Sequence, residues 1–169
     1  MTAYLAAALA GLALGSFLNV VITRLPRGEQ VATGRSHCLH CGATLPWHDN
    51  LPLLSFIWLK GRCRFCRGPI PWRYPAVELA GAGLALALWA AFPADPVLIA
   101  YLPFTFALLA LAVLDLEHRY LPDVITLPWI ILGLALAPVL HHLDFLEAFL
   151  GALAGGGFFW VIAWGYEKL

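Results

Sequence analysis

Two pairs of cysteines with identical spacing are the first residues in this chain that could do chemistry. Cys38 and Cys41 form one C-x2-C pair, and Cys63 and Cys66 form another after 21 intervening residues. Two such pairs can fold as facing turns that offer four thiolates in tetrahedral geometry, which suits Zn²⁺. A site closed by four thiolates leaves no open position for water, so the zinc would be structural rather than hydrolytic.

Two alternatives for these cysteines stay open. Two disulfides would use the same residues, although disulfides are rare in the reducing cytoplasm, where the charge distribution places this segment. Nearby histidines are substitute ligands, but they suit surface positions equally well: His37, His40 and His48. Gly42 directly follows the first pair, and Gly68 comes two residues after the second. Each glycine predicts a positive-φ turn that points backbone N–H groups at sulfur.

An acid at the end of an apolar run is the second candidate for chemistry. Asp115 directly follows Leu114, and a polar turn then leads to Pro122, which predicts the end of a helix, and to Asp123. A carboxylate at the carboxyl end of a helix meets an unfavourable dipole and partial desolvation. Both effects favour the protonated form that acid–base work needs. The alternative is an interfacial acid paired with Arg119.

The composition indicates which elements hold these residues. Of 169 residues, 62% are hydrophobic and 12% are charged, and the mean hydropathy is +0.81. An average soluble domain carries about 25% charged residues, so an ordinary soluble globule, a disordered chain and a nucleic-acid-binding module are excluded. Five apolar runs approach the roughly 20 residues that a membrane helix needs. They cover residues 3–22, 76–92, 97–114, 124–140 and 145–164.

We therefore expect an all-α polytopic membrane protein with about five transmembrane helices and a small zinc-binding insert. The first helix covers 1–23, the four-cysteine insert 24–74, and helices two to five 75–169. Eight of the ten Lys and Arg lie in the insert, and Arg119 and Lys168 fall on the same side when the passes alternate. Because basic loops stay inside, the insert is predicted to be cytoplasmic and the amino terminus to face out.

Four ordered motifs resemble those of the prepilin leader peptidases, the membrane aspartic peptidases that process type IV prepilins and the pseudopilins of type II secretion. The motifs are GSFLNVVI with RLP over 15–26, the two cysteine pairs, PWRYPAVEL over 71–79, and residues 115–128. The resemblance implies a bacterial inner-membrane location, prepilin or pseudopilin substrates, and a role for Asp115 as one of two catalytic aspartates. In members with the cysteine insert it also implies methylation of the new amino terminus with S-adenosylmethionine, although no cofactor loop is legible.

The sequence departs from the family pattern at the second catalytic aspartate. In the family that residue belongs to a Gly-x-Gly-Asp motif in a later helix, but here three glycines at 155–157 are followed by Phe158. We expect the 169-residue chain to be a fragment or a truncated gene product that lacks half of its dyad and is inactive alone. The sequence gives no reason to assign another acid as the catalytic partner of Asp115, whether Glu78, Asp123 or Glu167.

Two other functions stay open. A non-catalytic zinc-bearing membrane scaffold would dock a partner through the basic insert, and the missing second aspartate favours it for this chain. A transporter would use Asp115 and Glu78 in an ion path, but the sequence shows no paired inverted segments with broken helices to support this function. We expect the bilayer as a partner and no nucleic acid.

Overall fold

The computed structural model of this chain describes residues 1–140 and 144–168, except for the side chains of residues 139, 140 and 167. In this part of the chain the structure is helical, as predicted, and extended pairing is limited to two isolated β-bridges. The side chain of Glu167, one of the acids considered above, lies outside the described residues. The chain divides into two compact units, Met1–Leu121 and Pro122–Leu169.

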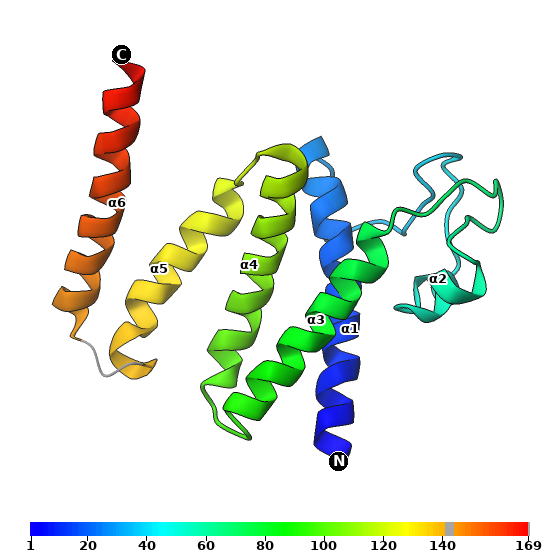
Figure 1. The fold of residues 1–169 in the computed structure, drawn as a ribbon, viewed down its shortest axis with the longest axis horizontal. Coiled ribbons are helices and arrows are strands. Elements are labelled where there is room, and N and C mark those ends of the chain that lie inside the picture. The colour runs from blue at the N-terminus through cyan, green and yellow to red at the C-terminus, as the bar shows by residue number, and fades with distance from the viewer. Residues whose placement is uncertain (141–143, 169) are drawn as a thin grey trace. The chain divides into compact units, whose positions relative to one another are not determined.

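Three long helices form the first unit (Figure 1): α1 (Thr2–Arg24), α3 (Arg73–Ala91) and α4 (Leu98–His118). Between α1 and α3 the polar insert forms only short elements, which are η1 (Leu25–Arg27), η2 (Trp47–Asn50) and α2 (Leu54–Trp58). A segment of this size buries little apolar surface by itself. Its position therefore depends on contacts with α1 and α3 and on the cysteine cluster.

Glycines allow α1 and α3 to pack with their backbones in close contact. A Cβ added at Gly11 would lie 2.5 Å from the carbonyl oxygen of Gly81, and one at Gly15 would lie 2.8 Å from the Cα of Glu78. Such small-residue seams are typical of helices that associate within a membrane. Helix α4 completes the unit through a face of buried residues: Phe106, Ala110 and Leu114.

Four helices are long and apolar enough, by length and composition, to cross a membrane: Thr2–Arg27, Arg73–Ala91, Leu98–His118 and Phe145–Tyr166. The second unit contains the last of these within α6 (Phe145–Glu167), together with α5 (Asp123–Leu140). The apolar part of α5 in the described residues, Asp123–Pro138, is shorter than these four. Four of the five expected spans thus meet the length and hydropathy that a crossing requires.

Candidate metal centre and adjoining cavity

The structure brings the four cysteines together in one cluster. Their four Sγ atoms all lie within 4.8 Å of one another, and those of Cys38 and Cys66 are 3.8 Å apart. Four sulfurs placed about 2.3 Å from a central Zn²⁺ would be about 3.8 Å apart, so the geometry fits a tetrahedral metal site. All four cysteines are free. Binding of zinc by Cys38, Cys41, Cys63 and Cys66 stays a prediction.

The first cysteine pair forms a tight turn that directs N–H groups toward sulfur. Gly42 donates its N–H to the carbonyl of Cys38 at 2.9 Å, and Cys38 donates its own to the carbonyl of Ala43 at 2.9 Å. The N–H of His40 points at the Cys38 Sγ at 3.4 Å. Gly42 has a φ of 70°, which is the positive-φ turn expected from the sequence.

The second pair forms the same turn, but a different residue type holds the positive φ. The positive φ expected at Gly68 falls instead on Arg67, at 60°, because Arg67 occupies the position directly after the pair. Arg67 donates its N–H to the carbonyl of Cys63 at 3.1 Å, and the Phe65 N–H points at the Cys63 Sγ at 3.4 Å. Gly68 is needed for close approach, since a Cβ there would lie 2.9 Å from the Cδ2 of His40.

The cluster favours the thiolate at one cysteine and opposes it at another. Burial opposes ionisation of Cys38, but backbone N–H groups of Cys41 and His40 outweigh it, together with bonds from neighbouring thiols, and lower its pKa to about 6. At Cys66 the N–H of Gly68 favours the thiolate, but burial and the other three cysteines raise the pKa to about 11. Four adjacent thiolates repel one another, so a divalent cation is the group that would let all four ionise.

The histidines stand outside the sulfur cluster. In the described part of the chain, the group that could hold a metal contains the four cysteines and no histidine. The Nε2 of His40 lies 3.2 Å from the carbonyl oxygen of Pro69, in hydrogen-bonding distance. The alternative of a histidine ligand therefore finds no support in this geometry.

An ion pair that the sequence analysis missed supports the second turn. Arg64, which lies between Cys63 and Cys66, donates from Nε and Nη2 to the two carboxylate oxygens of Asp49 at 2.9 and 2.6 Å. The Asp49 side chain is 2% exposed. Hydrogen bonds from Arg64 hold the pKa of Asp49 below its usual value despite burial. Because Asp49 belongs to η2, this pair ties the middle of the insert to the cluster.

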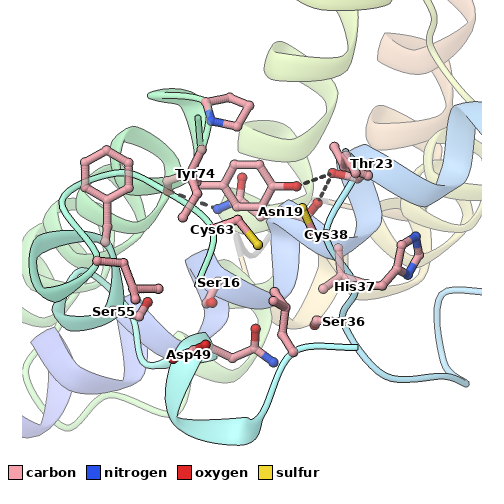
Figure 2. A pocket seen from close by; sticks show the side chains of 18 of the residues that line it. Ser16, Asn19, Thr23, Ser36, His37, Cys38, Asp49, Ser55, Cys63 and Tyr74 are labelled. Carbon is pink, nitrogen blue, oxygen red and sulfur yellow. Dashed lines mark hydrogen bonds between the residues drawn. The ribbon is translucent and has the colours of Figure 1, made fainter. Parts of the chain in front are cut away.

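A cavity of about 420 Å³ lies between the insert and the facing sides of α1 and α3 (Figure 2). Residues from the two helical motifs noted in the sequence line one side of it: Ser16, Asn19, Thr23, Tyr74 and Glu78. Residues from the insert line the other, and these include Cys38, Asp49, Ser55, Phe56, Leu59 and Cys63. Two motifs separated by about fifty residues of sequence thus form one wall, which periodicity within each motif could not reveal.

Asp115 lies in the last turn of α4 and is exposed. The ion pairs found in the described residues do not include one between Asp115 and Arg119, so the interfacial-pair alternative is not supported. Arg119 instead ends the helix with a φ of 50° and donates its N–H to the Asp115 carbonyl at 2.8 Å. Glu117 accepts a bond from Arg73 at 2.6 Å, so this end of α4 is tied to the start of α3.

Two family models match this chain in succession. The model described as the bacterial peptidase A24 N-terminal domain matches residues 9–92, and the one described as the type IV leader peptidase family matches residues 102–168. No solved structure matches the chain.

Relatives that carry the same name support these matches. A "prepilin leader peptidase/N-methyltransferase" of Klebsiella pneumoniae is 42% identical over 168 residues, which cover 95% of this chain and 73% of the relative. Its counterpart in Myxococcus xanthus is 43% identical over 145 residues, covering 86% of this chain and 43% of the relative. The counterpart in Burkholderia pseudomallei strain 1026b is 38% identical over 184 residues, and the match covers 94% of this chain and 60% of the relative. The chain thus spans about half the length of the Myxococcus and Burkholderia relatives.

The apolar helices and the four-cysteine insert between the first two of them define a helical membrane protein with a knuckle-like candidate metal centre. The chain belongs to the prepilin leader peptidase/N-methyltransferase family.

Proposed function

We propose that this sequence forms part of a membrane aspartic endopeptidase that removes the leader peptide from type IV prepilins and pseudopilins. The observation that carries the proposal is the match of the type IV leader peptidase family across α4 to α6, which contains Asp115. Asp115 stands exposed at the end of a membrane-length helix, where a carboxyl group can meet both a substrate segment and water.

In the proposed mechanism Asp115 is one of two carboxyl groups that act on a water molecule. One carboxylate accepts the proton of the water as it attacks the scissile amide, and the other, protonated, donates to the carbonyl oxygen. A single aspartate supplies one of these roles. The printed sequence contains no Gly-x-Gly-Asp motif, so we propose that the 169-residue polypeptide alone is inactive.

The cysteine cluster would serve this enzyme as a structural zinc site. Four thiolates saturate a tetrahedral ion, so the metal would hold the insert against α1 and α3 and would take no part in hydrolysis. We propose residence in the bacterial inner membrane, with the insert in the cytoplasm and the amino terminus outside. The basic residues support this orientation, because eight of ten lie in the insert.

A second activity, N-methylation of the new amino terminus, is supported by the names of the relatives, which include N-methyltransferase. S-adenosylmethionine would supply the methyl group when bound. The cavity beside the cysteine cluster has a volume within the roughly 300–1,000 Å³ of small-molecule sites. Its lining also offers hydrogen-bonding side chains, such as Ser36 and Asn50, that could hold a polar cofactor.

A chimaera tests the peptidase proposal. Residues 1–169 are fused to the part of the Klebsiella relative that lies beyond the match, and the product is expressed with a prepilin substrate. We expect a gel shift of the prepilin with the chimaera and none with the 169-residue polypeptide. Failure of the chimaera, with both proteins present in the membrane, would favour the non-catalytic zinc-bearing scaffold. Cleavage by the short form would show that another acid completes the dyad, with Asp123 the first candidate.

A further inference from the structure

The polar residues of the cavity form a ladder across the α1–α3 seam. Ser16, Asn19 and Thr23 recur on one face of α1, while Tyr74 and Glu78 stand four residues apart on α3. Asn19 donates from Nδ2 to the carbonyl of Tyr74 at 3.0 Å, and one turn further along the seam Ser16 and Glu78 both line the cavity. These two levels of the ladder are therefore separated by about one helical turn, or roughly 5.4 Å.

Asn19 presents an unused acceptor beside this cavity. Its side chain is almost completely buried, with the residue 2% exposed, and its Oδ1 has no hydrogen-bond partner in the described residues. The bond from Nδ2 to Tyr74 fixes which way the amide points, since the flipped amide would set two oxygens against each other. A buried acceptor without a partner is unfavourable, so a ligand that donates a hydrogen bond there would be stabilised.

Glu78 adds a carboxyl group to the same wall. The residue is 7% exposed and accepts a hydrogen bond from the N–H of Leu53, but a buried carboxylate is also stabilised by a positive charge beside it. Neither arginine of the lining is available for this purpose. Arg24 donates to backbone carbonyls of residues 30–35, and Arg64 is engaged by Asp49.

We propose that this cavity binds a primary ammonium group attached to an apolar body, with Glu78 and the Oδ1 of Asn19 as its acceptors. An ammonium group donates three hydrogen bonds and would supply a positively charged partner for the Glu78 carboxylate. Apolar side chains complete the lining for the body of the ligand, among them Phe17, Phe56 and Leu59.

The chemical class of this ligand follows from the proposed peptidase, on which the inference rests. Hydrolysis of an amide releases one carboxylate and one amine, and the amine is protonated in neutral water. The ligand that fits is therefore the new amino terminus of a polypeptide whose first residues are apolar. That group is also the acceptor in the proposed methylation, so the cavity would hold the product of the first reaction as the substrate of the second.

Binding is measured with a short fluorescent peptide of apolar residues in two forms, one with a free amino terminus and one N-acetylated. The protein is the zinc-loaded 169-residue chain in detergent micelles. We expect the free form to bind at least about tenfold more tightly, as the loss of a charge-assisted hydrogen bond predicts. Glu78→Gln should remove most of this preference, because glutamine carries no charge. Glutamine can still accept the N–H of Leu53, so the local fold is kept.

Asp95→Asn is the matched control, since it neutralises a carboxylate in the loop between α3 and α4 that does not line the cavity. It should keep the full preference for the free amino terminus. Asn19→Ala provides a second test and should weaken binding of the free form alone. Zinc content and helical circular dichroism show whether each variant is folded.

Equal affinity for the two peptides would overturn the proposal, as would an unchanged preference in folded Glu78→Gln. The assay contains no cleavage step, so its failure would leave the peptidase proposal standing. Failure of the chimaera to cleave prepilin would, in turn, leave the binding preference measurable.

Discussion

The carboxylate of Glu78 accepts a hydrogen bond from the backbone N–H of Leu53 at 2.8 Å, and this bond joins a membrane-length helix to the four-cysteine insert. Leu53 has a φ of 60°, in a region that residues with a Cβ rarely occupy. The resulting sharp turn precedes α2 and brings that short helix over the cavity. Two side chains of α2, Ser55 and Phe56, and the following Leu59 then line the cavity.

Gly11→Ala should destabilise the first unit, whereas Gly83→Ala should not. A Cβ at Gly11 would lie 2.5 Å from the Gly81 carbonyl oxygen, while one at Gly83 meets nothing within 4 Å. Alanine is favoured over glycine inside a helix by about 1 kcal/mol, so Gly83→Ala should be neutral or stabilising. Overpacking at Gly11 should cost about 1–3 kcal/mol. Thermal unfolding in detergent compares the two, and equal Tm values would contradict the close seam.

The purified chain should contain one Zn²⁺, and Cys63→Ser should lose most of it. Because structural zinc contributes on the order of 10 kcal/mol to the folding of small units, loss of one ligand should also make the insert sensitive to protease. Elemental analysis and limited proteolysis measure the two effects, with Ser36→Ala as the control. A chain without stoichiometric zinc, or with disulfides when alkylated at lysis, would refute the assignment.

Asp49→Asn should remove a pH-dependent contribution to the stability of the insert. Bonds from Arg64 hold the pKa of Asp49 below its usual value, so the folded state favours the carboxylate. The contribution is present above about pH 4, where aspartate in an unfolded chain is ionised, and is lost as the pH falls through the lower folded pKa. The difference in Tm between the wild type and Asp49→Asn should therefore shrink at acidic pH. A constant difference would contradict the role of this charge.

Much of this arrangement could be predicted because single residues or short patterns determine it. Apolar runs of membrane length predicted the helices, and the spacing of Cys38, Cys41, Cys63 and Cys66 predicted which side chains would meet. The positive φ expected at Gly68 was wrong, because the turn geometry depends on distance from the cysteine pair and not on residue type.

Other features depend on how helices pair, and no pattern within one helix records that. Gly81 and Gly83 look equivalent in sequence, yet Gly81 meets α1 and Gly83 meets open space. The ladder of Asn19 and Glu78 likewise appears only once α1 and α3 are side by side. The bond between Asp49 and Arg64 requires the folded insert, since the two residues are 15 positions apart in the sequence.

The insert should be inaccessible from outside the cell. Cys41 is exposed in the structure, so it should react with a thiol reagent once zinc is chelated. We expect an impermeant reagent to label Cys41 in permeabilised, chelator-treated cells and not in intact ones. A cysteine introduced at Thr2, at the exposed amino terminus, should instead be labelled in intact cells as well as in permeabilised ones. Labelling of Cys41 in intact cells would reverse the proposed orientation.

The central claim is that Asp115 takes part directly in prepilin cleavage, and one substitution in the chimaera tests it. Asp115→Asn keeps the size of the side chain but cannot be ionised, so processing of a co-expressed prepilin should fall by several orders of magnitude. The Asp95→Asn chimaera should process prepilin normally, and the two variants should contain the same amount of zinc. Full cleavage by folded Asp115→Asn would remove Asp115 from the mechanism and contradict the account.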